Sequence, residues 1–227
     1  MAQGIVNQFL DYLFGSAAPK VEKKCNTCEM LQEQCLWNMT APSIESYAQM
    51  TSDTKATICV IGGGYSNTAS ADFTIIAGGD RNIANAIYAA IAGGQSNTAS
   101  GNYSFIGGGS GNTASGQYAV VFGGQNNQAS ADYAFVGGGR NNLASGIYST
   151  VTGGQQNTAS GQYAFVGGGQ NNIASGNYAV VLGGSNNEAR GAYSFAAGQR
   201  MRALGDRTFV WGHSAGNVDV TQNDAFV

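Results

Sequence analysis

The sequence carries little charge, and its scarce residue types exclude several classes of protein. Charged side chains make up 10% of the 227 residues, against about a quarter in ordinary soluble domains. A net charge of −3 leaves no basic surface for nucleic acid. One histidine and no paired carboxylates leave no acid–base or nucleophilic site, so we expect no enzyme and no cofactor. The 35 glycines lack a three-residue period, which excludes collagen.

A long apolar run is also missing. No stretch reaches the roughly 20 apolar residues that a transmembrane helix needs. The apolar residues between Ile5 and Leu13 have helical spacing, and no basic residue precedes them, so a secretory signal is not expected. We predict instead an amphipathic helix that docks on a larger assembly, with a membrane surface as the alternative. A second helix over residues 20–40 has a seven-residue spacing that suits a neck between chains.

Four cysteines precede the main body of the sequence: Cys25, Cys28, Cys35 and Cys59. Cys25 and Cys28 have the close spacing found in zinc sites, but the other two do not form a second such pair. We expect buried free thiols, with zinc ligation and disulfides as alternatives.

The sequence is dominated by a 15-residue unit that repeats nine times between residues 63 and 198. Each unit opens on a glycine pair and contains an asparagine, an alanine two residues later and an aromatic residue six residues later. The asparagines are Asn67, Asn82, Asn97, Asn112, Asn127, Asn142, Asn157, Asn172 and Asn187. The aromatic row consists of Phe73, Tyr88, Tyr103, Tyr118, Tyr133, Tyr148, Tyr163, Tyr178 and Tyr193. A short fixed period predicts a solenoid.

Side chains alternate within each unit, as in Tyr-Ala-Phe-Val at residues 163–166, and this is the period of a β-strand. The glycine pairs supply the positive φ that a tight corner needs. We therefore predict an all-β parallel solenoid of nine 15-residue coils. One such coil encloses little volume, so we expect its second apolar face, at positions such as Ala119 and Val121, to be covered by further copies, in a homotrimer.

The asparagine row and the aromatic row have different expected roles. Stacked coils place the asparagines above one another, so we predict an amide ladder in which each side chain bonds the next. The tyrosine row is either a packing stripe between coils or chains, or an exposed aromatic face that binds a sugar or a receptor. The sequence leaves both readings open.

Units such as Gly-Asn-Thr-Ala-Ser-Gly-Gln-Tyr-Ala at residues 111–119 resemble the head repeats of YadA-like trimeric autotransporter adhesins, which also occur in phage and viral fibre proteins. The run Asp-Arg-Thr-Phe-Val-Trp-Gly at residues 206–212 is similar to the segment that often closes such arrays. This resemblance, over residues 62–198, implies a left-handed parallel β-roll with three chains side by side.

Three regions follow from these patterns. Residues 1–60 form an N-terminal helical anchor and neck, residues 61–198 the β-roll, and residues 199–227 a C-terminal cap and tail. Several arginines cluster near the cap: Arg190, Arg200, Arg202 and Arg207. We expect them to be solvated or paired with Asp206, and a small anion or glycan site is the alternative.

The expected function is structural. Ice binding would require regular threonine rows, but position 68 and its equivalents read Thr, Ile, Thr, Thr, Gln, Leu, Thr, Ile and Glu. We predict a trimeric fibre or minor capsid component on the surface of a virus or phage particle, anchored to other virion proteins through residues 1–60. Host attachment through a receptor or glycan is an expected further role. The alternative is the head of a bacterial surface adhesin that binds a host receptor or matrix.

Overall fold

A computed structural model of the chain describes residues 59–227. The helices predicted over residues 1–40, and the thiols of Cys25, Cys28 and Cys35, lie outside the described residues. No helix occurs within residues 59–227, and therefore none there that could span a membrane.

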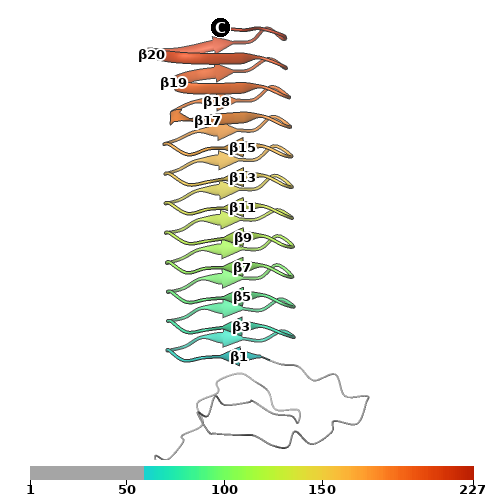
Figure 1. Cartoon of the computed structure of the whole chain (residues 1–227), viewed down its shortest axis with the longest axis vertical. Helices are drawn as coiled ribbons and strands as arrows, with labels where there is room; N and C mark the ends of the chain where they lie inside the picture. Colours follow the sequence, from blue (N-terminus) through green and yellow to red (C-terminus); the bar gives the residue numbers. More distant parts are fainter. Residues whose placement is uncertain (1–58) are drawn as a thin grey trace, which may run out of the picture.

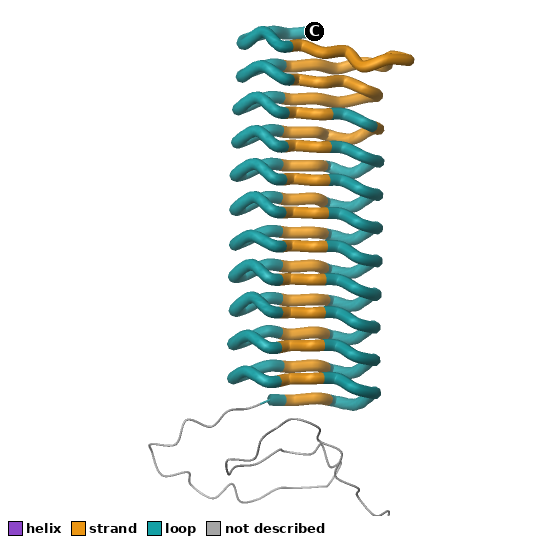
Figure 2. Tube along the Cα trace, turned by 180° about the vertical axis from the view of Figure 1, so that it is seen from behind, coloured by secondary structure: helices purple, strands orange, loops and turns teal. Residues whose placement is uncertain are grey.

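The described chain is a straight stack of flat coils with short strands on two opposite faces (Figures 1 and 2). The strands of the first face are β1 (Val60–Ile61), β3 (Ile75–Ile76), β5 (Ala90–Ile91), β7 (Phe105–Ile106), β9 (Val120–Val121), β11 (Phe135–Val136), β13 (Thr150–Val151), β15 (Phe165–Val166) and β17 (Val180–Ser185). The second face contains β2 (Thr68–Ala69), β4 (Ile83–Ala84), β6 (Thr98–Ala99), β8 (Thr113–Ala114), β10 (Gln128–Ala129), β12 (Leu143–Ala144), β14 (Thr158–Ala159), β16 (Ile173–Ala174) and β18 (Glu188–Ala189). The last two strands, β19 (Phe195–Ala203) and β20 (Phe209–Val220), are long enough to take part in both faces.

Each short strand pairs in parallel with the strand two places along the chain. In the middle of the rod Phe105 lies opposite Val120, and Ile106 lies opposite Val121. Identical positions of successive repeats are therefore stacked, as the 15-residue period predicts. The parallel β-solenoid and its repeat architecture are confirmed.

The core is thin because one coil contributes only three small or β-branched inward side chains besides its asparagine. On the first face a β-branched residue points inward, and from Ile76 to Val181 this row is at most 1% exposed. On the second face the inward residue is always the alanine of the repeat, and from Ala84 to Ala189 this row is fully buried. A larger residue opposite the β-branched row would not fit between the two sheets, which explains why alanine recurs there without exception.

The third inward side chain of each coil belongs to a row of alanine, serine and threonine that includes Ala119, and the alanines of this row from Ala89 to Ala179 are at most 1% exposed. The sequence prediction that Ala119 and Val121 face other copies is therefore wrong, because both lie in the core of the single chain.

The predicted number of coils is wrong, because the rod has about eleven turns rather than nine. Strand β1 adds a turn below the first complete repeat by pairing with β3. Beyond residue 198, β19 and β20 continue the stack, with Phe195 opposite Phe209 and Phe209 opposite Phe226. These offsets are 14 and 17 residues instead of 15, so a fixed period does not detect the last turns.

Candidate interaction surfaces

The asparagine row joins neighbouring coils through bonds from side chain to backbone. The Oδ1 of Asn97 accepts the backbone N–H of Asn112 at 2.9 Å. The Nδ2 of Asn112 donates to the carbonyl oxygens of Gly108 and Gly124 at 2.9 and 3.0 Å. The same three contacts recur in every coil from Asn82 to Asn172.

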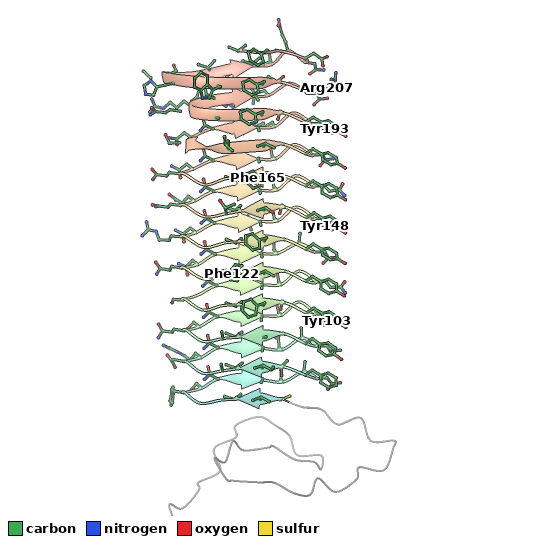
Figure 3. All side chains as sticks on the ribbon, in the orientation of Figure 1. Tyr103, Phe122, Tyr148, Phe165, Tyr193 and Arg207 are labelled. Carbon is green, nitrogen blue, oxygen red and sulfur yellow. The ribbon has the colours of Figure 1, made fainter. Side chains whose placement is uncertain are left out.

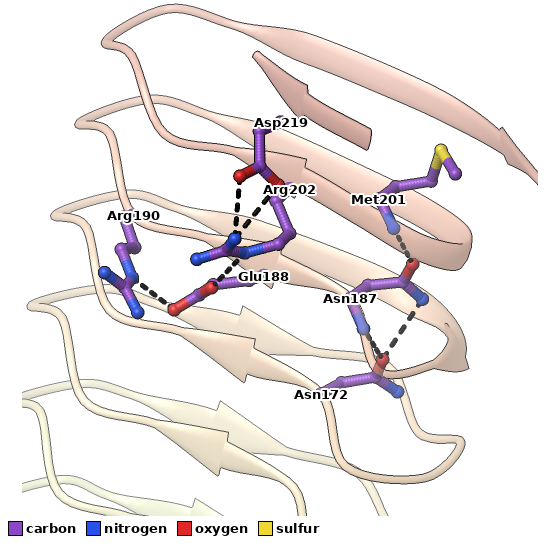
Figure 4. A network of polar contacts seen from close by, with 7 residues as sticks. All are labelled: Asn172, Asn187, Glu188, Arg190, Met201, Arg202 and Asp219. Carbon is purple, nitrogen blue, oxygen red and sulfur yellow. Dashed lines mark hydrogen bonds and ion pairs between the residues drawn. The ribbon is translucent and has the colours of Figure 1, made fainter. Parts of the chain in front are cut away.

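At the upper end of this row Asn187 accepts the backbone N–H of Met201 and also donates to the Oδ1 of Asn172 (Figure 4). The predicted hydrogen bond between successive asparagine side chains is thus present between Asn187 and Asn172. In the other coils the asparagine side chain bonds backbone groups instead. Because each carboxamide uses its oxygen and both donor hydrogens, the buried row leaves no polar group of its own unsatisfied.

The position three residues before each asparagine, next to its carboxamide, requires glycine. At Gly109 the backbone φ is +87°, and a Cβ there would lie 2.1 Å from the carbonyl oxygen of Gly124 and 2.7 Å from the Nδ2 of Asn112. The second glycine of the pair therefore supplies both the backbone conformation and the space for the carboxamide.

The tyrosine row lies along one edge of the rod, with its rings stacked on one another (Figure 3). From Phe73 to Tyr193 the centroids of successive rings are 4.7–4.9 Å apart, and their planes differ by 15° or less. The side chains remain 39–62% exposed, through their edges and phenol groups. Because each inner ring is covered on both faces by its neighbours, a sugar cannot stack on it. The surface that remains offers ring edges and hydroxyl groups.

These aromatic residues have an unfavourable backbone. Tyr103 has a φ of +60°, and the other members of the row lie between +56° and +60°. The left-handed region costs an ordinary L-residue about 1–2 kcal/mol. An aromatic pair contributes roughly 0.5–1.5 kcal/mol beyond its buried area, so the stack offsets much of this strain. Burial raises the pKa of the Tyr133 phenol, and its neighbours Tyr148 and Tyr118 add to the effect.

The first face of the rod presents two outward columns of side chains without a single charge, and we call it the apolar face. The first column is Val60, Ile75, Ala90, Phe105, Val120, Phe135, Thr150, Phe165, Val180, Phe195 and Phe209. The second column, two residues further along the chain, is Gly62, Ala77, Ala92, Gly107, Phe122, Gly137, Thr152, Gly167, Leu182, Ala197 and Trp211. In the middle of this face Phe122 packs edge-on between Phe105 and Phe135, with ring centroids 6.2 and 5.7 Å away.

The second face presents hydroxyl groups and is called the hydroxyl face. Its outward columns start at Thr68 and Ser70 and repeat every coil. The serine column is regular, since serine occupies seven of its nine positions in the repeats, from Ser70 to Ser175. The threonine column is interrupted, for example by Gln128 and Leu143. Most of the exposed polar surface of the flat sheets therefore lies opposite the apolar face.

A network of ion pairs occupies the upper end of the hydroxyl face (Figure 4). The buried carboxylate of Glu188 bonds Arg190 and, at 2.8 Å, Arg202, whose guanidinium also reaches Asp219 at 2.8 Å. Hydrogen bonding to Glu188 raises the pKa of Arg202. These pairs join three successive turns where the repeat ends.

Arg207 and Asp224 continue the stack above the tyrosine row. The backbone N–H of Arg207 bonds the carbonyl of Ala192, as that of Tyr193 bonds Asn177, and its φ is +53°. Its side chain pairs with Asp224, and this hydrogen bond lowers the pKa of the aspartate. The expected partner Asp206 accepts the backbone N–H of Ala192 instead. The arginines near the cap are therefore used mainly within the stack.

Cys59 is the one proposed metal ligand among the described residues. Its thiol is free, half-buried, and donates to the carbonyl oxygen of Ala71 at 3.2 Å. Within residues 59–227 no group of three or more histidine, cysteine or acidic side chains is arranged to hold a metal ion. The zinc alternative depends on cysteines outside this range.

Comparison with known families finds one match: residues 115–212 match the model of the grass antifreeze β-roll. No curated protein matches the chain. The match covers rather less than half of the sequence, and together with the stacked coils it supports a β-roll repeat protein, a class of fold that is typically non-catalytic. It does not extend to the adhesin heads that the repeats resemble.

The geometry of the asparagine row leads to a stability prediction. We expect Asn112→Ala to lower the free energy of unfolding by about 3 kcal/mol or more, because one N–H and two carbonyl groups lose their buried partner. Urea denaturation at fixed protein concentration measures the loss. The matched control is Asn85→Ala on the exposed side of the second face. Equal losses in the two variants would contradict the role of the row.

Proposed function

We propose that the protein is a non-enzymatic structural rod that assembles with copies of itself, as a homotrimer, along the apolar face. The observation that supports this most strongly is the extent of that face. At about 4.8 Å per coil it forms a strip roughly 50 Å long and about 10 Å wide, on the order of 500 Å². This is near the upper end of the apolar patches that soluble monomers expose, about 300–600 Å².

The composition of the strip agrees with burial in an assembly. Phe122, Leu182 and Trp211 are 57–70% exposed in the single chain. The twenty-two positions of the two columns contain no charged residue, and a buried interface centre is likewise depleted of charge. The repeats resemble those of trimeric heads, which favours three copies over two.

A trimeric rod of this kind suits an exposed fibre or minor capsid component of a virus or phage particle, with residues 1–60 as its attachment to the particle. The hydroxyl face and the tyrosine edge would remain outside such a trimer. They are the surfaces on which host attachment would depend, whether in a particle fibre or in the alternative, a bacterial adhesin head.

The mass of the full chain in solution, measured by light scattering in reductant, tests the assembly. We expect a trimer, and we expect Phe122→Asp with Leu182→Asp to reduce the mass threefold, because four carboxylates per pair of chains cannot be buried without partners. The matched control places the same charges on the hydroxyl face, at Thr113 and Thr158, and should remain trimeric. A monomeric unmodified chain, or dissociation by the control alone, would overturn the proposal.

Ice binding is a second candidate, favoured by the match to the grass antifreeze β-roll. Its surface would be the hydroxyl face, where Thr98 and Ser100, and Thr113 and Ser115, lie on successive coils. The interruptions at Gln128 and Leu143 argue against a continuous array.

An assay of ice recrystallisation with the purified chain tests whether the protein binds ice. We expect no inhibition beyond that of an unrelated protein at equal mass concentration. Inhibition that is lost in Thr98→Lys with Thr113→Lys would instead establish the hydroxyl face as an ice-binding surface.

A further inference from the structure

The apolar face has a second period, twice as long as the repeat. In its second column small and larger residues alternate from coil to coil: Gly107, Phe122, Gly137, Thr152, Gly167, Leu182, Ala197 and Trp211. In the first column the order is reversed between Phe105 and Phe195, because phenylalanine stands on the coils where the second column is small. From Phe105 to Ala197 the face thus repeats every 30 residues, or about 9.6 Å along the rod.

On the coils that have glycine in the second column, no side chain of that column protrudes from the apolar face. A Cβ at Gly137 would lie 3.4 Å from the Cε1 of Phe135, and one at Gly167 would lie 3.2 Å from the Cε1 of Phe165. The rings of Phe135 and Phe165 therefore lean across the glycine two residues further along the chain. Glycine is also required by the backbone, since a Cβ at Gly137 would meet the carbonyl oxygen of Thr152 at 2.3 Å.

The coils between them carry the protruding side chains. Phe122 and Leu182 are 58% and 57% exposed, and in the first column the same coils have the smaller residues Val120 and Val180. Val120 pairs with Phe105 and Phe135 on the coils below and above, so at this coil the first column carries a smaller residue between two large ones. On the coils of Val120 and Val180 a protruding side chain thus stands beside a smaller residue of the first column, and the alternate coil between them carries Thr150 and Thr152.

We propose that this pattern sets the axial register in which copies of the chain assemble: parallel, level with one another, and able to shift only by an even number of coils. The inference rests on the proposed self-assembly. Rotating one rod onto another about an axis parallel to the rod brings the first column of one copy against the second column of the next. At equal height Phe122 of one copy then packs over Val120 of the next, and Leu182 packs over Val180.

Other registers fit worse. A shift of one coil places Phe122 against the ring of Phe105 or Phe135, and it leaves Val120 opposite a glycine. A shift of two coils restores the fit but leaves two coils uncovered at each end. An antiparallel pair brings each column against itself. The occupant of the face is therefore a second copy, since a partner with another axial spacing would not match a 9.6 Å repeat.

Disulfide trapping between differently tagged chains tests the register. The chains carry serine in place of Cys25, Cys28, Cys35 and Cys59, and each carries one new cysteine. A disulfide between a Thr150→Cys chain and a Thr152→Cys chain reports copies at equal height. A disulfide between a Phe135→Cys chain and a Thr152→Cys chain reports a shift of one coil. A disulfide between a Thr150→Cys chain and a Leu182→Cys chain reports a shift of two coils. We expect the first pair to form a bond at least roughly ten times faster than the second, because a disulfide requires Cβ atoms about 3.8 Å apart.

The third pair should react slowly or not at all, and Thr150→Cys chains alone should not cross-link to one another. Faster bonding in the Phe135 and Thr152 pair, or self-linking of Thr150→Cys, would overturn the register. The mass of each mixture before oxidation separates the two proposals. A monomer contradicts the proposed self-assembly itself, whereas a trimer with the wrong cross-links contradicts the register alone.

Discussion

The buried carboxamide of the repeat asparagine is the interaction on which the rod depends. A coil of this size cannot hold itself together by hydrophobic burial alone, since its interior apart from the asparagine is one β-branched side chain, one alanine and one further alanine, serine or threonine. The asparagine fixes the corner of its own coil through one glycine carbonyl and joins the next coil through another carbonyl and an N–H. Its neighbouring glycine is a consequence of this arrangement, because any Cβ there would collide with the carboxamide.

The inward and outward positions of the repeat serve different purposes. Inward alanine, asparagine and β-branched residues are nearly invariant along the rod because stacking requires it. Outward residues vary, and their variation is ordered on the apolar face and irregular in the threonine column. A match between β-rolls can rest on the shared inward pattern, whereas function lies in the outward columns. This is why the match to the antifreeze β-roll and the proposed self-assembly are compatible.

Much of the architecture can be predicted from the sequence, because a strict period fixes which residues stack. The strands, the glycine corners and the buried asparagine row all follow from it. The last turns do not, because their offsets of 14 and 17 residues carry Met201 and Val218 where the repeat would have its asparagine. The sequence also left open whether the tyrosine row packs between coils or forms an exposed face, and the structure shows stacked rings with exposed edges. This stacking depends on a positive φ at Tyr103 and its equivalents, which a bulky residue seldom adopts and which no sequence pattern indicates.

Amide hydrogen exchange tests most directly whether the asparagine row holds the coils together. The backbone N–H of Asn112 bonds the buried Oδ1 of Asn97, whereas that of Ile87 bonds the exposed Oδ1 of Asn102 at a comparable distance. If the row is the central constraint, the amides of Asn97 to Asn172 exchange only through global unfolding and are the slowest in the rod, and Ile87 exchanges through local opening. Exchange of the asparagine amides as fast as that of Ile87 would contradict the account.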